Sequence, residues 1–168
     1  MRDTAIGQLE SSHRRHDDRL ELLVVAAEQL ASGHGGPDDL EELEDHVTWF
    51  ARSVPMHFGD EDEVVFPALV AVRPDLAAPL AAISAEHAGL LAAHTHVREV
   101  VLGWKGFEPA ADTLPSFVAA VRDLATRYRD HAAREDALFA TLAASEGDAG
   151  VTLDNESLLA ALGTRRGR

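Results

Sequence analysis

The chain has 168 residues, with Lys+Arg 15 against Asp+Glu 29, a net charge of −14 with histidine neutral, and no cysteine. Without cysteine, disulfides, Cys-ligated zinc, iron–sulfur clusters and thiol nucleophiles are excluded, and imidazole and carboxylate are left as the strong metal ligands. The acidic balance argues against nucleic acid and anionic membranes as partners, because a phosphate backbone is bound by clustered Lys and Arg.

The N-terminal residues have no apolar signal core, and no apolar run approaches the roughly 18 residues that span a bilayer. We therefore expect a cytoplasmic protein with neither nucleic acid nor membrane as a partner. Protein partners are not indicated by the composition.

Glycine and proline divide the sequence at three places, residues 33–37, 73–75 and 103–109. The stretches around these turns are rich in Ala, Leu, Glu and Arg, which favour helices. The third and fourth stretches have apolar residues at spacings of three and four, typical of buried helical faces. Ionisable residues interrupt both faces, and they include His87, His94, His131 and Glu135.

Short connections between long helices favour antiparallel neighbours. The sequence therefore predicts an all-α fold, an up-down-up-down antiparallel four-helix bundle over residues 1–145. Residues 146–168 lose the helical pattern and are predicted to form a C-terminal tail, with room for a short extra helix over 155–162.

Histidines from all four predicted helices fall at one height of this bundle. In an up-down bundle, residues on consecutive helices lie at the same height when their midpoint falls on the connecting turn. The midpoint of His16 and His57 falls in the first turn. The midpoint of Glu61 and His87 falls in the second turn, and that of His87 and His131 falls in the third.

Two of these helices add a carboxylate to the same layer. Glu61 follows His57 by four residues. Glu135 follows His131 at the same spacing, so each pair shares one face of its helix. Unpaired buried charges cost on the order of several kcal/mol each, whereas two metal ions would neutralise both carboxylates and use every imidazole. We therefore predict a dinuclear metal site with the ligands His16, His57, Glu61, His87, His131 and Glu135.

Ligand chemistry narrows the choice of metal. Imidazole and carboxylate without sulfur suit iron, with manganese and zinc as competitors. Glu61 and Glu135 are each suited to bridge two ions. The set leaves coordination positions open, where oxygen, peroxide or nitric oxide would bind.

Three segments carry a specific motif: residues 57–69 read HFGDEDEVVFPAL, Glu86 precedes His87, and residues 131–139 read HAAREDALF. Over about residues 8–145 the chain resembles the hemerythrin-like (HHE cation-binding) family. That family has a His in helix one, His-x-x-x-Glu in helices two and four, and a His in helix three. The resemblance implies two iron ions in an oxo- or hydroxo-bridged, non-haem di-iron centre. It also implies oxygen binding or sensing, iron handling, or chemistry with peroxide or nitric oxide.

Two departures from the family pattern bear on the chemistry. Oxygen-carrying hemerythrins have a second helix-three histidine four residues after the first, and that position is Leu91 here. We therefore do not expect reversible oxygen carriage. The interval from Glu135 to the next phenylalanine is one residue shorter than the matching interval after Glu61, which leaves Asp136 as a competing ligand.

Several assignments stay open at this point. His13 lies one turn before His16 and is the alternative ligand in the first helix. Tyr128 shares a face with His131 and is interpreted as a core residue, with contact to a metal-bound oxygen as the alternative. His94 is interpreted as a polar core residue or one that supports a ligand.

The residues around Glu61 have simpler interpretations. Asp60, Asp62 and Glu63 are expected to form a solvated face. Pro55, inside the second helix, removes a backbone hydrogen bond, and it either widens that helix or separates two helical segments.

These features predict a non-haem di-iron protein that reacts with or binds a small oxidant, namely peroxide, oxygen or nitric oxide. Catalase-like or peroxidase-like activity is the form of enzyme that we expect, although no catalytic residue is assigned. The alternative function is a non-catalytic sensor of oxygen or nitric oxide, or an iron-binding module.

Overall fold

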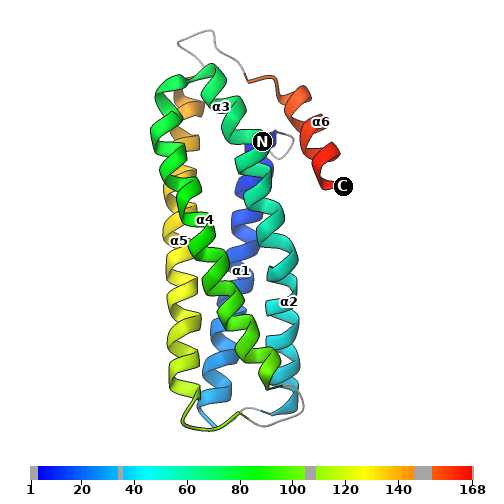
Figure 1. Ribbon diagram of the computed structural model, residues 1–168, viewed down its shortest axis with the longest axis vertical. Helices are drawn as coiled ribbons and strands as arrows, with labels where there is room; N and C mark the ends of the chain where they lie inside the picture. The colour runs from blue at the N-terminus through cyan, green and yellow to red at the C-terminus, as the bar shows by residue number, and fades with distance from the viewer. Residues whose placement is uncertain (1–3, 34–35, 105–108, 146–152, 168) are drawn as a thin grey trace. The chain divides into compact units, whose positions relative to one another are not determined.

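All regular secondary structure in the described residues is helical. The computed structural model describes residues 4–33, 36–104, 109–145 and 153–167, and no strand occurs among them (Figure 1). The all-α prediction is therefore confirmed. The elements are α1 (Ala5–Ala31), α2 (Pro37–Asp60), the π-helix η1 (Glu61–Val65), α3 (Phe66–Val72), the 3-10 helix η2 (Pro74–Leu76), α4 (Ala77–Gly103), α5 (Leu114–Ser145) and α6 (Asn155–Arg166).

The first predicted turn separates α1 from α2, although residues 34–35 lie outside the described residues. Gly33 follows α1 with a φ of 77°, a left-handed conformation that glycine adopts without strain. Pro37 begins α2, where its missing amide hydrogen is not needed. Asp39 accepts a hydrogen bond from the amide of Gly36 at 2.6 Å. Residues 105–108 of the third turn and 146–152 of the predicted tail also lie outside the described residues.

The chain folds into two compact units, each assembled from segments that are distant in sequence. The first unit comprises Met1–Arg14, Pro55–His87 and Asp130–Arg168. The second unit comprises Arg15–Val54 and Ala88–Arg129. Helices α1, α2, α4 and α5 each contribute to both units, whereas η1, α3, η2 and α6 belong to the first.

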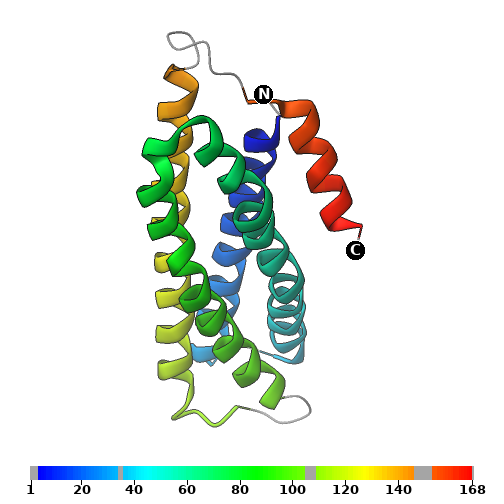
Figure 2. The same cartoon turned by 45° about the horizontal axis from the view of Figure 1, so that its top comes forward.

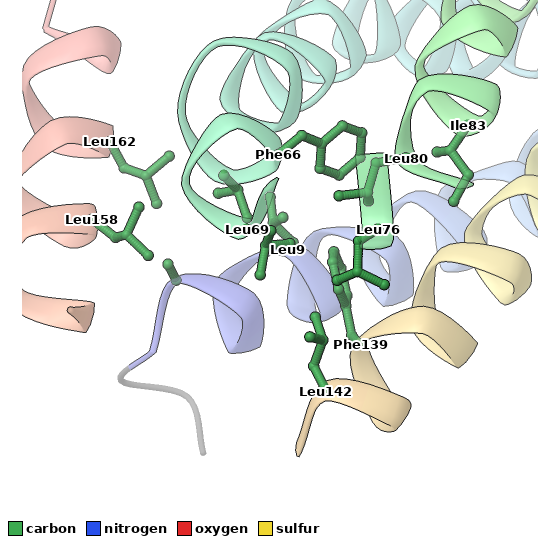
Figure 3. Close-up of a cluster of buried hydrophobic side chains, with 12 residues drawn as sticks. Leu9, Phe66, Leu69, Leu76, Leu80, Ile83, Phe139, Leu142, Leu158 and Leu162 are labelled. Atoms are coloured by element: carbon green, nitrogen blue, oxygen red, sulfur yellow. The ribbon is translucent and has the colours of Figure 1, made fainter. Parts of the chain in front are cut away.

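A cluster of buried apolar side chains forms the core of the first unit (Figure 3). Leu158 and Leu162 of α6 point toward Leu69 and Leu9 in that view. Leu162 is only 1% exposed, and burying a leucine contributes roughly 1.5–3 kcal/mol. This helix is longer than the one predicted at 155–162. The buried members of the cluster are Ala5, Leu9, Val65, Phe66, Leu69, Leu76, Leu80, Ile83, Phe139, Leu142, Leu158 and Leu162.

In the second unit, neighbouring helical segments lie side by side in both views (Figures 1 and 2). Between α1 and α2, the side chain of Arg19 donates a hydrogen bond to Nδ1 of His46 at 3.1 Å. His94 of α4 donates to the carbonyl of Val47 in α2 at 3.2 Å. The α1 and α5 segments run antiparallel, as their ion pairs Arg122–Glu28 and Arg129–Asp17 show.

The helical run Pro74–Gly103 has 30 residues and a mean hydropathy of 1.4 over its most apolar window, so by length and composition it is able to cross a membrane. The expectation that no apolar run approaches 18 residues therefore does not hold for this helical run. A core helix of a soluble protein passes the same test, so the finding is weak evidence for a span. The absence of a membrane partner stays a prediction.

Candidate metal centre

The first unit brings histidines from four helices together around one glutamate. His13, His57 and Glu61 form one group that could hold a metal ion, and Glu61, His87 and His131 form another. The ligand atoms of each group lie within 4.8 Å of one another. Glu61 therefore belongs to both groups.

The two oxygens of Glu61 face different histidines. Oε1 lies 2.8 Å from Nε2 of His57 and 3.7 Å from Nε2 of His13. Oε2 lies 3.3 Å from Nε2 of His87. On the other side, Oε2 of Glu135 lies 3.3 Å from Nε2 of His13 and 3.8 Å from Nε2 of His131. Glu61 is thus flanked by imidazole nitrogens from α1, α2 and α4, and Glu135 by those from α1 and α5.

Carboxylates also hold the outer nitrogens of three of these rings. Nδ1 of His13 lies 2.8 Å from Oδ1 of Asp136. Nδ1 of His87 lies 2.9 Å from Oδ2 of Asp62. Similarly, Nδ1 of His131 lies 3.0 Å from Oε2 of Glu86. A carboxylate can only accept, so each Nδ1 donates, and in the neutral ring Nε2 then presents its lone pair to the centre. This arrangement orients histidine rings in metal sites.

The centre buries polar atoms that the protein itself does not satisfy. Glu61 and Glu135 are both 0% exposed. Among the described residues, neither oxygen of either carboxylate has a hydrogen bond, and neither do Nε2 of His13 and Nε2 of His87. Leaving a buried polar group unsatisfied costs about 1–3 kcal/mol, and more when it is charged. A bound cation would satisfy these atoms, so the donor set fits a metal site.

Burial and neighbouring charge shift the protonation of the metal-free centre. Burial lowers the pKa of His13, but the hydrogen bond with Asp136 and the nearby carboxylates of Glu135 and Glu61 outweigh it and raise the value to about 11. Burial raises the pKa of Glu61 well above its usual value. Burial also lowers the pKa of His131, against the raising effect of Glu86. Such strongly shifted groups are typical of functional sites.

A π-turn accounts for the unequal spacing noticed in the sequence. The amide of Phe66 donates to the carbonyl of Glu61, five residues earlier, at the end of η1. The turn therefore takes up the one extra residue between Glu61 and Phe66. Pro67 follows in the first turn of α3, and its ring would crowd the carbonyl four residues earlier in a regular α-helix. α2 itself continues through Pro55 as an α-helix.

Asp136 and the first-helix histidines lie differently from the sequence prediction. Asp136 was the rival of Glu135, but it contacts the outer nitrogen of His13 instead. His13, the alternative, lies beside the two buried glutamates. His16, the preferred ligand, has Nε2 at 2.8 Å from Oγ of Ser53 and Nδ1 hydrogen-bonded to the hydroxyl of Tyr128. The metal-capable groups thus contain His13 and not His16, and His13 is the first-helix ligand that we carry into the proposal.

The register of the predicted helices does not distinguish His13 from His16, because the first turn is long. The midpoints of His57 with His13 and with His16 both fall within residues 33–37, so the rule does not separate histidines one turn apart. Tyr128 is buried, as interpreted, and its hydroxyl bonds His16. His94 is a buried polar residue, which agrees with its interpretation.

The acidic run is not a solvated face throughout. Asp60 is only 2% exposed and its carboxylate pairs with Arg165 and Arg166 of α6. Asp62 is exposed, yet it bonds His87 and accepts from the hydroxyl of Ser84 at 2.6 Å. The solvated-face interpretation is wrong for Asp60 because the partners of this residue come from a helix that the sequence did not connect with it.

Comparison with known families identifies the family to which the chain belongs. Residues 4–143 match the model of the hemerythrin HHE cation binding domain. Searches of curated proteins and of solved structures found no match. The match covers most of the chain and all the buried histidines and glutamates described above. The chain therefore belongs to the hemerythrin HHE cation-binding family.

Proposed function

We propose that this protein holds two iron ions and uses them to react with a small oxidant. The observation that carries the proposal is the shared position of Glu61 between two metal-capable groups. The proposed fold is a single up-down-up-down bundle of the four long helical runs. The proposed ligands are His13, His57, Glu61, His87, His131 and Glu135.

The donor chemistry supports iron. Four imidazoles and two carboxylates form a nitrogen and oxygen set without sulfur, which suits iron better than metals that prefer thiolate. Glu61 and Glu135 would each bridge, because Glu61 lies beside histidines of three helices and Glu135 beside histidines of two. Two bridging anions would lower the net charge of the pair and favour higher oxidation states.

When bound, a pair of iron ions supplies redox equivalents and open coordination positions for peroxide, oxygen or nitric oxide. The protein supplies fixed ligand orientation, because Asp136, Asp62 and Glu86 hold three of the rings. It also supplies an apolar side chain that covers two of the histidine rings. Phe58 stacks on His87, with ring centroids 4.0 Å apart and an angle of 3°, and meets His131 edge-on at 5.5 Å.

The first test is metal content together with the ultraviolet–visible spectrum of the purified protein, followed by addition of hydrogen peroxide at an oxygen electrode. We expect two irons per chain, near-ultraviolet absorption of a bridged pair, and oxygen release. Two irons without oxygen release would favour the sensor or iron-binding alternative. Absence of iron after anaerobic loading with ferrous salt, or exclusive binding of zinc, would overturn the redox function.

A matched pair of variants ties the result to the site. Glu61→Gln removes the proposed bridge, and Glu28→Gln removes an exposed glutamate of the second unit that pairs with Arg122. We expect oxygen release to be lost in Glu61→Gln and kept in Glu28→Gln. Equal activity of the two variants would contradict the role of the centre.

A further inference from the structure

The last helix, α6, lies beyond the residues that match the family model, yet it belongs to the first unit. Leu158 and Leu162 anchor it in the apolar cluster (Figure 3). Its last turn carries Arg165 and Arg166. These two cations reach the segment where α2 passes into the π-turn.

Both arginines pair with the residue before Glu61. Nη1 of Arg165 donates to Oδ1 of Asp60 at 3.0 Å, and Nε of Arg166 donates to Oδ2 of Asp60 at 2.7 Å. The side chain of Asp60 is only 3% exposed, so this is a buried carboxylate with both oxygens paired. Removing the partners of a buried charge is strongly destabilising for the conformation that holds it. We call this pairing the arginine clamp.

The guanidinium of Arg165 spans the start of the π-turn. It donates to the carbonyl of Met56 at 3.0 Å, and Nη2 lies 3.2 Å from Oε1 of Glu63. Gly59 provides the room, because a Cβ at that position would lie 1.5 Å from Nη2 of Arg165. The absence of a side chain at Gly59 thus leaves the space that the guanidinium of Arg165 occupies. This close approach supports the placement of Arg165 in addition to its ion pairs.

We infer that Arg165 and Arg166 are positioning residues for Glu61, acting through Asp60. A π-turn holds one residue more than a turn of α-helix. If the π-turn shifted by one residue along the chain, the residue at its start would rotate about the helix axis by about 100° and move along it by about 1.5 Å. Such a rotation would carry the carboxylate of Glu61 away from His57, which now lies 2.8 Å from it. The clamp fixes the residue at which the π-turn begins. The inference rests on the proposed metal site.

The test compares four full-length proteins: wild type, the double variant Arg165→Ala/Arg166→Ala, Gly59→Ala, and the control Arg122→Ala. Arg122 is a matched control because it forms an exposed ion pair in the second unit. Gly59→Ala leaves both arginines in the chain, but its methyl group would occupy the space that the guanidinium of Arg165 now fills. Alanine is a better helix former than glycine, so loosening in this variant comes from the displaced guanidinium.

Two readouts are measured. The first is amide hydrogen exchange of the metal-free proteins over residues 60–66, with α5 as the internal reference. The second is the rate at which ferrozine, a chelator of ferrous iron, removes iron from proteins loaded and kept anaerobically with ferrous salt, at matched helical content by circular dichroism. Supporting groups around metal ligands typically change affinity 10–100-fold when removed. We expect faster exchange confined to residues 60–66 and about tenfold faster iron release in both clamp variants, with Arg122→Ala unchanged.

The outcomes separate this inference from the proposed function. Wild type that binds no iron would overturn both. Wild type that binds two irons, with exchange and release unchanged in Gly59→Ala, would overturn the clamp and leave the metal site standing. If the double variant does not fold, Gly59→Ala decides alone. Faster exchange spread equally over α5 would show a general structural role and would also overturn the positioning role.

Discussion

His13 and Asp136, which are 123 residues apart in sequence, meet through Nδ1 and Oδ1 at 2.8 Å. Asp136 therefore lies on the outer side of the ring, while Nε2 on the inner side faces Glu61 and Glu135. The same arrangement recurs at two other histidines. The centre thus has an inner set of carboxylates beside the proposed ions and an outer set that orients the rings.

Asp136→Asn tests this division. An asparagine oxygen still accepts a hydrogen bond from His13 but carries no charge, so the ring keeps its place with lower basicity. We expect two irons at saturating metal and about 10–100-fold weaker binding. Titration with ferrous iron, followed by competition with a chelator, measures the change. Loss of one ion at saturation would instead make Asp136 a ligand.

His13→Gln and His16→Gln form a matched pair. We expect His13→Gln to lose iron and His16→Gln to keep it. His16 is fully buried and bonds Ser53 and Tyr128, so we expect His16→Gln to lower the free energy of unfolding by about 1–3 kcal/mol. Metal analysis and urea unfolding on both variants measure the two effects. The reverse pattern of iron retention would restore His16 as the ligand.

Glu61→Gln separates binding from folding. Burial raises the pKa of Glu61 and so favours its neutral form in the metal-free protein. A neutral amide of similar shape should therefore cost little there, and we expect the metal-free variant to be as stable as metal-free wild type, or more stable. The variant should bind fewer than two irons. Thermal melting with and without iron, together with metal analysis, checks both statements. Retention of two irons with an unchanged spectrum would show that Glu61 is not a bridge.

Metal removal should lower the melting temperature. A ligand that binds only the folded state at 100 times its dissociation constant contributes about 2.7 kcal/mol, and a chain of this size gains roughly 2–4 °C per kcal/mol. We expect the melting temperature to rise by this amount when iron is added and to fall back when a chelator removes the iron. A melting temperature that does not respond to any of iron, manganese or zinc would contradict the cation site.

His94 of the second unit should make the stability of the protein decrease at acidic pH. Burial lowers the pKa of His94 below 6.5, the ordinary value of a histidine, and Arg98 adds to the lowering, against the hydrogen bond to Val47. The folded state therefore binds fewer protons than the unfolded state, so stability is complete above pH 6.5 and falls as the pH drops below it. His94→Gln keeps a donor without titrating. Its melting temperature should fall less between pH 7 and 5 than that of wild type.

The His-x-x-x-Glu pairs were predictable because a spacing of four residues puts both side chains on one helix face whatever surrounds the helix. The structure keeps Glu61 at 2.8 Å from His57 and Glu135 at 3.8 Å from His131. Their roles as metal ligands stay predictions. The fold class was predictable for a similar reason, since helical periodicity is local.

The features that the sequence did not reveal depend on contacts between distant segments. His13 and His16 differ by less than one turn along α1, about 4.5 Å, and only packing chooses between them. The π-turn lies between Glu61 and Pro67, where a spacing mismatch was visible but had no assigned cause. The pairing of Asp60 with α6 could not be seen, because charge patterns do not show which partner a carboxylate meets.

The donors of the candidate centre come from three separate segments of the first unit, which are synthesised one after another. His13 comes from its first segment, His57 to His87 come from its middle segment, and His131 and Glu135 come from its last. A nascent chain on the ribosome therefore lacks the complete donor set until Glu135 has been translated. On the proposed function, metal ions that are present before this segment is made would meet only part of the donor set, so the complete centre would be assembled after its translation.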